Sequence, residues 1–223
     1  MRFLFDEKAG ENALLISGAP LLHLKARRVR AGETIDLRNL QDDNIHRYSI
    51  ESFGKTSATL ALIKSELKPV LPSRDISLAW CAVDPKTIEK TLPALNEIGV
   101  GRLTLLASEK SWRGFRVNYD RMDRILVGSC EQCGRSRKME IVFMDLAEFA
   151  RNTPNAALLD FGGAKLTREA LQGYEFIVGP EGGFGEKDYA ALKNAPRFGV
   201  DLALVLRSES AALFIASLRL ADL

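Results

Sequence analysis

The pattern of apolar residues changes at a proline-containing segment, PVLPSR (69–74), and this change constrains the fold more than any other feature of the chain. Before it, short stretches of alternating residues are separated by glycine, asparagine or aspartate, which is typical of β-strands joined by turns. After it, short apolar stretches alternate with amphipathic ones, which predicts a mostly parallel sheet with helices on both faces. We therefore expect a small β-barrel-like domain at residues 1–68, a linker at 69–74 and an α/β domain at 75–223.

Individual elements can be assigned from the same pattern. In the first domain we expect strands at residues 33–39, 44–53 and 57–67. In the second domain we expect strands at residues 76–83, 102–108, 139–144, 156–160, 175–179 and 201–206. Asp84 and Pro85 are suited to start a helix, which Pro93 should bend. A further helix is expected at residues 117–135, and the last one follows Ser208.

Composition indicates a soluble globular protein of the cytoplasm. Of 223 residues, 46% are hydrophobic and 27% are charged. No apolar run approaches the roughly 20 residues of a membrane span, and the first residues, MRFLFDEKAGEN, lack the apolar core of a secretory signal. The cysteines number three, an odd count that fits a reducing compartment better than a disulfide framework.

The net charge of +2 conceals an uneven distribution along the chain. Residues 102–138 contain nine Lys and Arg against four Asp and Glu, or +5, whereas residues 139–223 contain eight against twelve, or −4. The basic segment also contains Trp112, Phe115 and Tyr119. Basic residues interleaved with aromatic ones suit a nucleic-acid surface. A solvated helix face beside ordinary core aromatics explains the same pattern.

Three loops that follow late strands are expected to meet at one edge of the sheet. They are DFGG (160–163), GPEGGFG (179–185) and RSESA (207–211). The carboxyl ends of parallel strands lie at the same edge, and open α/β sheets bind ligands there. The glycines permit positive φ and the close approach of another group. The sequence thus predicts a single crevice lined by backbone groups.

The GPEGGFG loop does not match either common phosphate-binding motif. A P-loop requires Gly-Lys-Ser/Thr, and a dinucleotide loop requires a third glycine where Asp188 stands. Glu181 in the loop would repel a phosphate. We therefore expect the ligand to be neutral or cationic at its nearest point.

Arg207, Ser208 and Glu209 each have two interpretations. Arg207 directly follows an apolar stretch and could bind a phosphate or polarise a base carbonyl. It could equally pair with Glu181 or Glu209. Ser208 and Glu209 could belong to the site, or could simply cap the last helix and favour its dipole.

Cysteine and histidine chemistry has little support. Cys130 and Cys133 form a C-x-x-C pair late in an expected helix, where buried structural thiols are more typical than a redox pair. The chain has two histidines, His23 and His46, and both lie in the first domain. A zinc site requires four ligands, so we expect no metal.

Five short motifs in order resemble those of a known family. The motifs are NEIGV (96–100), ASEKS (107–111), CEQCGR (130–135), VGPEGGF (178–184) and LVLRSESA (204–211). Together they resemble the bacterial 16S ribosomal RNA uridine-N3 methyltransferase family of the SPOUT superfamily. The segment HLKARRVRAGE (23–33) also resembles part of that family's PUA-like RNA-binding domain. The resemblance extends over essentially the whole chain.

The resemblance implies a fold and a set of partners. It implies an α/β methyltransferase domain with a deep trefoil knot at roughly residues 156–212, and a small PUA-like β-barrel domain before it. It implies S-adenosylmethionine as the cofactor, a homodimer, and 16S ribosomal RNA within the small ribosomal subunit as the substrate. In this chain, Asp201-Leu202 stand where the family usually has Leu-Gly.

Residue roles also follow from the resemblance. Arg207 is expected to stabilise charge on the base, with Glu209, Glu181 or water as proton acceptor. The expected cofactor-binding residues are Leu159, Gly179, Pro180, Glu181, Gly182, Gly183, Leu202, Leu204, Leu206 and Ser210. The expected RNA-binding residues are Lys25, Arg27, Arg28, Arg30, Arg113 and Arg135, the last across the dimer.

Two alternatives remain open from the sequence. One is a SPOUT methyltransferase that acts on another RNA, either transfer RNA or a ribose 2′-hydroxyl. The other is a non-catalytic RNA-binding relative that has lost its cofactor site, which the Asp201-Leu202 departure leaves open. Nucleoside analysis separates the first from the N3-uridine function, and a cofactor titration tests the second.

Overall fold

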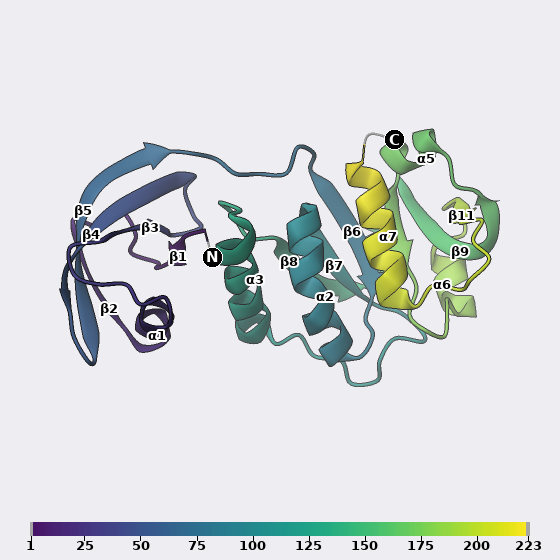
Figure 1. Cartoon of the computed structure of the whole chain (residues 1–223). Helices are drawn as coiled ribbons and strands as arrows, with labels where there is room; N and C mark the ends of the chain where they lie inside the picture. The colour runs from purple at the N-terminus through teal and green to yellow at the C-terminus, as the bar shows by residue number, and fades with distance from the viewer. Residues whose placement is uncertain (1, 222–223) are drawn as a thin grey trace. The chain divides into compact units, whose positions relative to one another are not determined.

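The computed structural model describes residues 2–221. The chain divides into two compact units (Figure 1). The first unit comprises Met1–Leu71 together with Val127–Lys138, and the second comprises Pro72–Leu126 together with Met139–Leu223. The expected division at residues 69–74 did not include the return of residues 127–138 to the first unit.

The first unit is built on a five-stranded sheet with the strand order β1-β3-β4-β5-β2. Its strands are β1 (Leu4–Phe5), β2 (Ala13–Ser17), β3 (Thr34–Arg38), β4 (Asn44–Phe53) and β5 (Ser57–Leu67). Helix α1 (Gly18–Ala26) follows β2. The pairings are antiparallel except β1 with β3. Three strands therefore form where the alternating pattern predicted them, around a core that includes Leu24, Leu37, Tyr48 and Leu60.

Residues 127–138 join the first unit through hydrogen bonds that no local pattern reveals. The Arg2 N–H donates to the backbone oxygen of Glu131 at 2.7 Å, and the Phe5 N–H donates to the Glu131 side-chain Oε1 at 2.8 Å. Ser136 Oγ donates to Asp43 Oδ1 at 2.8 Å, and Arg137 forms an ion pair with the same carboxylate. These contacts span about a hundred residues of sequence, so periodicity predicted only the helix and not its partner.

The second unit has a six-stranded sheet with the order β11-β9-β10-β6-β7-β8, and every pairing is parallel. Its strands are β6 (Ile76–Cys81), β7 (Val100–Ala107), β8 (Glu140–Asp145), β9 (Ala156–Lys165), β10 (Glu175–Val178) and β11 (Arg197–Gly199). Its helices are α2 (Pro85–Ile98), α4 (Leu146–Asn152), α5 (Arg168–Gly173), α6 (Glu186–Ala191) and α7 (Ser208–Leu220), and α3 (Tyr119–Cys133) begins in it. The expected α/β unit with a parallel sheet is confirmed.

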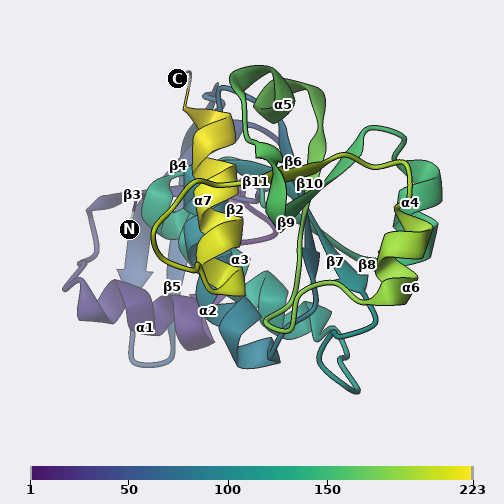
Figure 2. The same ribbon diagram turned by 90° about the vertical axis from the view of Figure 1, so that its right-hand side faces the viewer.

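Each face of this sheet is covered by its own helices (Figure 2). On β6, Leu78 and Trp80 pack in the core cluster that contains residues of α2, α3 and α7. Ala79 and Cys81 pack in the cluster that contains residues of α4 and the loop before α6. Successive side chains of a strand point to opposite faces, so a strand buried on both faces must be apolar throughout. This explains the continuous apolar run in ISLAWC.

Two sequence-based assignments near the expected crevice are wrong. Residues 201–206 form a loop and not a strand, and Leu204 and Val205 are 80% and 77% exposed. The last strand of the sheet is instead the short β11, which pairs with β9 at the sheet edge. The glycines of DFGG lie inside β9 and not in a loop after it, because Gly163 lets the backbone of Arg197 and Phe198 approach where a side chain would collide. An apolar run alone did not distinguish a buried strand from an exposed loop.

No helix within residues 2–221 combines the length and apolar content needed to cross a membrane.

Candidate active site

The Gly179–Gly185 loop leaves the carboxyl end of β10, as the sequence predicted. Gly183 has a φ of +67°, and a β-carbon built there would meet nothing within 4 Å. The Gly183 N–H donates to the Pro180 oxygen at 2.9 Å and closes a tight turn. Glu181 and Gly182 are exposed at this turn. The loop therefore presents backbone groups to solvent at a position where glycine imposes no side chain.

A second segment, ASEKS (107–111), holds this loop in place. Lys110 Nζ donates to the backbone oxygens of Gly182 and Phe184, at 3.1 and 3.0 Å. The Glu109 carboxylate accepts from the Lys187 N–H at 2.9 Å. One ammonium group thus connects two backbone oxygens of the loop. The motif that contributed to the family resemblance thus acts as a clamp on the glycine loop.

Asp188 completes the clamp from the other side. Its carboxylate accepts from the Gly185 N–H at 2.9 Å and from the Glu109 N–H at 3.0 Å. Asp188 is buried, in the first turn of α6. A carboxylate there is favoured by the helix dipole and satisfies N–H groups that would otherwise lack partners. From the sequence, Asp188 was noted as the residue that stands where a dinucleotide-binding loop has glycine, and this role was missed.

The start of α7 is joined to the same loop by a buried chain of hydrogen bonds. Trp80 Nε1 donates to Ser208 Oγ at 2.7 Å, and Ser208 Oγ donates to the Gly179 oxygen at 2.5 Å. Trp80 is fully buried at the end of β6. Of the two interpretations of Ser208, helix capping finds no support, because the N-cap is Arg207 and the Ser208 hydroxyl is engaged with Trp80 and Gly179. The hydrogen bonds from Trp80 to Ser208 and from Ser208 to Gly179 fix the distances between β6, β10 and α7.

Arg207 is exposed at the N-cap of α7, with Glu209 in the first turn. Within residues 2–221, Arg207 forms no ion pair with Glu181 or Glu209, so that alternative finds no support. The Arg207 backbone oxygen accepts from the Ala211 N–H at 2.8 Å, which fixes the backbone but leaves the guanidinium at the surface. The site therefore has one exposed cation directly beside the residue that binds the glycine loop.

The other expected cofactor-binding residues fall into two groups, one half-buried near the glycine loop and one exposed to solvent. Leu159 is half-buried at the point where β9 pairs with the end of β10, opposite Val178. Leu206 and Ser210 are also half-buried and flank Arg207 in sequence. Leu202 and Leu204 lie in the exposed 201–206 loop. The structure thus brings the loop glycines, Leu159, Leu206 and Ser210 to one edge of the sheet, whereas the side chains of Leu202 and Leu204 face solvent.

Most of the expected RNA-binding residues are exposed, but one is buried. In the first unit, Lys25, Arg27, Arg28 and Arg30 are all exposed. In the second, Arg113 is exposed and Trp112, beside it, is 54% exposed. Phe115 instead packs on Phe143, with ring centroids 5.5 Å apart. Arg135 is only 7% exposed, which argues against its direct contact with RNA.

The cysteines are structural. Burial raises the pKa of the Cys81 thiol to about 12, so this thiol stays protonated and unreactive at neutral pH. Cys130 is buried against Phe3 and Leu40, and Cys133 ends α3. All three are free thiols. Among residues 2–221, no group of three or more His, Cys, Asp or Glu side chains is placed to hold a metal ion.

Removal of the Ser208 hydroxyl should destabilise the protein. We expect Ser208→Ala to lower the free energy of unfolding by about 1–3 kcal/mol, because Trp80 Nε1 would be left buried without its partner. Ser210→Ala, two residues further along α7, removes none of the hydrogen bonds between Trp80, Ser208 and Gly179. It should change the free energy of unfolding by less than about 0.5 kcal/mol. Urea unfolding followed by tryptophan fluorescence measures both. Equal stability of the two variants would contradict a stabilising role for the hydrogen bonds that link Trp80, Ser208 and Gly179.

Comparison with known proteins places this geometry in a family. A family model described as an RNA methyltransferase domain matches residues 70–219. A ribosomal RNA small subunit methyltransferase E from Helicobacter pylori is 38% identical over 223 residues, which cover 98% of this chain and 99% of that protein. The protein of the same name from Aquifex aeolicus is 25% identical over 228 residues, 98% of each chain.

Solved structures show the same fold. The ribosomal RNA small subunit methyltransferase E from Neisseria gonorrhoeae, bound to S-adenosylmethionine, matches with a TM-score of 0.80 at 21% identity, over 97% of this chain and 95% of that one. A Legionella pneumophila protein, also with bound S-adenosylmethionine, matches with a TM-score of 0.80 at 24% identity, over 98% and 97%. The chain belongs to the RNA methyltransferase family that includes the small-subunit ribosomal RNA methyltransferases E.

Proposed function

We propose that this protein transfers a methyl group from S-adenosylmethionine to N3 of a uridine in 16S ribosomal RNA of the small ribosomal subunit. Family membership supports ribosomal RNA methylation, since the relative from Helicobacter pylori is named a ribosomal RNA small subunit methyltransferase and aligns with this chain over nearly its full length. The observation that carries the proposal is the clamped glycine loop, joined through Ser208 to the exposed Arg207. The expected trefoil knot at roughly 156–212 and the homodimer are part of the same proposal.

The residues present fit the cofactor. When bound, it supplies a methyl group on a positively charged sulfur. The Gly179, Pro180, Gly182 and Gly183 backbone would bind its adenosyl part, with Leu159, Leu206 and Ser210 nearby. Lys110 is occupied with two loop oxygens, and Glu181 is exposed, so the loop is not set up for phosphate. A carboxylate near a sulfonium is favourable by ordinary Coulomb attraction.

Methylation at N3 requires an accessible base and the loss of one proton. N3 lies on the Watson–Crick edge, so the uridine must be unpaired or flipped out. The N3–H proton leaves, N3 bonds to the methyl carbon, and the carbon–sulfur bond breaks with its electron pair staying on sulfur. Arg207 would stabilise the negative charge that develops on O2 and O4. Glu209, Glu181 or water would accept the proton.

RNA would reach the site over two basic surfaces. The surface of the first unit consists of four exposed basic residues that suit backbone phosphates: Lys25, Arg27, Arg28 and Arg30. In the second unit, Trp112 and Arg113 follow the Lys110 clamp directly. An exposed indole can stack on a base and contributes roughly 1–3 kcal/mol when it does so. Exposure at these positions supports an RNA substrate.

The direct test is methyl transfer to its proposed substrate. Labelled S-adenosylmethionine and small ribosomal subunits that lack the modification should yield label in N3-methyluridine after nucleoside digestion. Label in another nucleoside would keep the methyltransferase assignment but contradict the N3-uridine target. Absence of both transfer and cofactor binding would favour the non-catalytic RNA-binding alternative.

Arg207→Ala should separate catalysis from binding. We expect methyl transfer to fall by about 10²–10³-fold, as when one group that stabilises transition-state charge is removed. Cofactor affinity should change by less than about twofold, because backbone groups of the glycine loop are unaltered. Arg151→Ala, an exposed arginine at the end of α4, is the control and should keep full activity. Loss of cofactor affinity in Arg207→Ala would assign Arg207 a structural role instead.

A further inference from the structure

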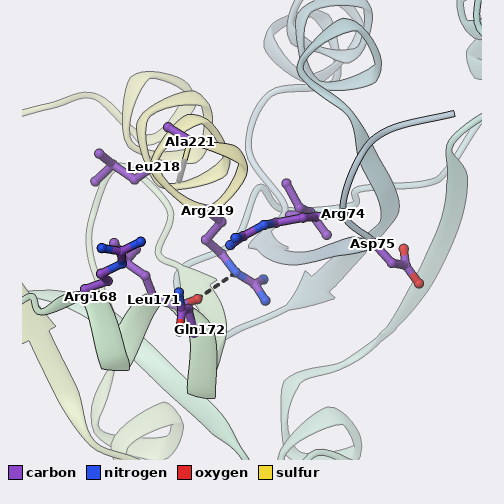
Figure 3. A pocket seen from close by; sticks show the side chains of 9 residues that line it. Arg74, Asp75, Arg168, Leu171, Gln172, Leu218, Arg219 and Ala221 are labelled. Atoms are coloured by element: carbon purple, nitrogen blue, oxygen red, sulfur yellow. Dashed lines mark hydrogen bonds between the residues drawn. The ribbon is translucent and has the colours of Figure 1, made fainter. Parts of the chain in front are cut away.

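A pocket of about 150 Å³ in the second unit is lined by three arginines from separate elements (Figure 3). Arg74 precedes β6, Arg168 is the first residue of α5, and Arg219 lies in the last turn of α7. Gln172 and Asp75 also line it, with Leu171 and Leu218 as apolar wall. Side chains far apart in sequence thus converge on one small space.

The pocket lies at the opposite end of the sheet from the glycine loop. Strand β6 begins at Ile76, which lines the pocket, and α7 begins beside the loop and ends in the pocket. Eleven residues of α7 separate Ser208 from Arg219 by about 16 Å at 1.5 Å per residue. The pocket is therefore distinct from the site proposed for methyl transfer.

Arg219 is held in a fixed position by backbone oxygens. Its Nε donates to the Leu171 oxygen at 3.2 Å, and its Nη1 donates to the Ser77 oxygen. Within residues 2–221 no hydrogen bond from Nη2 is formed, so this nitrogen is available to a ligand. Burial lowers the pKa of Arg219, whereas Glu175 and Asp75 act to raise it. A half-buried guanidinium that is fixed in advance loses little conformational entropy when it binds an anion.

The charges in the pocket favour an anion. Among the described residues that line the pocket, three are arginines and one, Asp75, is acidic, and Figure 3 shows Asp75 pointing away from Arg74 and Arg219. Glu175, outside the lining, also acts on Arg219. Arg74 and Arg168 also take part in other interactions within the chain. The concentration of positive charge is notable because residues 139–223, which supply Arg168 and Arg219, carry a net charge of −4. An anion that enters the pocket would be attracted to each of the three guanidinium groups.

We propose that the Arg74, Arg168 and Arg219 pocket binds a phosphate group. A tetrahedral phosphate can accept from several guanidinium groups at once, which a single carboxylate cannot do as completely. The Gln172 amide can add a further donor. Given the proposed function, the source we infer is a backbone phosphate of the RNA substrate, remote from the target uridine. A free phosphate ester offers the same chemistry, and the experiment separates the two.

The test uses the full-length protein and the variant Arg74→Gln/Arg168→Gln, which leaves the anchored Arg219 in place. Its matched control is Arg151→Gln/Lys193→Gln, which removes the same charge from exposed positions of the same unit. The probe is inorganic phosphate, titrated by calorimetry at fixed ionic strength. We expect saturable binding by the wild type and the control, and at least tenfold weaker binding by the Arg74/Arg168 variant. Equal affinity in all three proteins would overturn the proposal.

A second measurement identifies the source of the phosphate. The salt dependence of binding to a 16S ribosomal RNA fragment should lose a slope of roughly one per phosphate contact removed. A shallower slope in the variant supports the RNA backbone, whereas an unchanged slope with lost phosphate binding supports a free phosphate ester. Should the double variant fail to fold, Arg168→Gln alone, at an exposed position, repeats both measurements. The phosphate titration involves neither cofactor nor methylation, so its failure is distinguishable from failure of the proposed function.

Discussion

The buried hydrogen-bond chain from Trp80 through Ser208 to Gly179 is the interaction on which the arrangement of this site depends. It connects the ends of β6 and β10 with the start of α7, and Ser208 lies 128 residues from Trp80 and 29 residues from Gly179. An indole N–H buried without a partner costs free energy, so this hydrogen bond favours the arrangement in which the three segments meet. Arg207 owes its position to this chain because it directly precedes Ser208.

The clamp formed by Glu109, Lys110 and Asp188 adds the second constraint. It binds backbone groups of the glycine loop and therefore restricts a segment that glycine would otherwise leave mobile. The positive charge of Lys110 is satisfied by loop oxygens and not directed at a ligand. This explains how a glycine-rich loop in a parallel sheet can suit a cationic cofactor in place of a phosphate. The arginines that suit a phosphate are gathered at the other end of the same sheet.

Sequence reasoning predicted the architecture well because apolar periodicity reports directly on burial. The strands that contain Leu78, Leu105 and Ile177 were all expected, and so was the glycine loop at the end of β10. The same reasoning failed for Leu204 and Val205, whose apolar character indicated a buried strand although both are exposed. Periodicity records side-chain type, and it does not record whether another segment covers that side chain.

The network that holds the site was beyond sequence reasoning for a different reason. The sequence left Ser208 as either a site residue or a helix cap and could not identify its partners Trp80 and Gly179, which are remote in sequence. The ASEKS motif contributed to the family resemblance without any indication of its role. The return of Glu131 to the first unit was missed in the same way, since its partner Phe5 lies 126 residues away. Local rules describe each segment, and long-range hydrogen bonds decide which segments meet.

The most direct measurement of this account is a calorimetric titration of S-adenosylmethionine into wild type, Lys110→Met and Lys187→Met. Lys187 is a near neighbour whose side chain is exposed and makes none of the contacts with the loop oxygens. We expect Lys110→Met to weaken cofactor binding tenfold or more, about 1.4 kcal/mol, and Lys187→Met to bind within about twofold of wild type. Wild-type affinity in Lys110→Met, with the fold intact, would contradict the claim that the clamped loop forms the cofactor site.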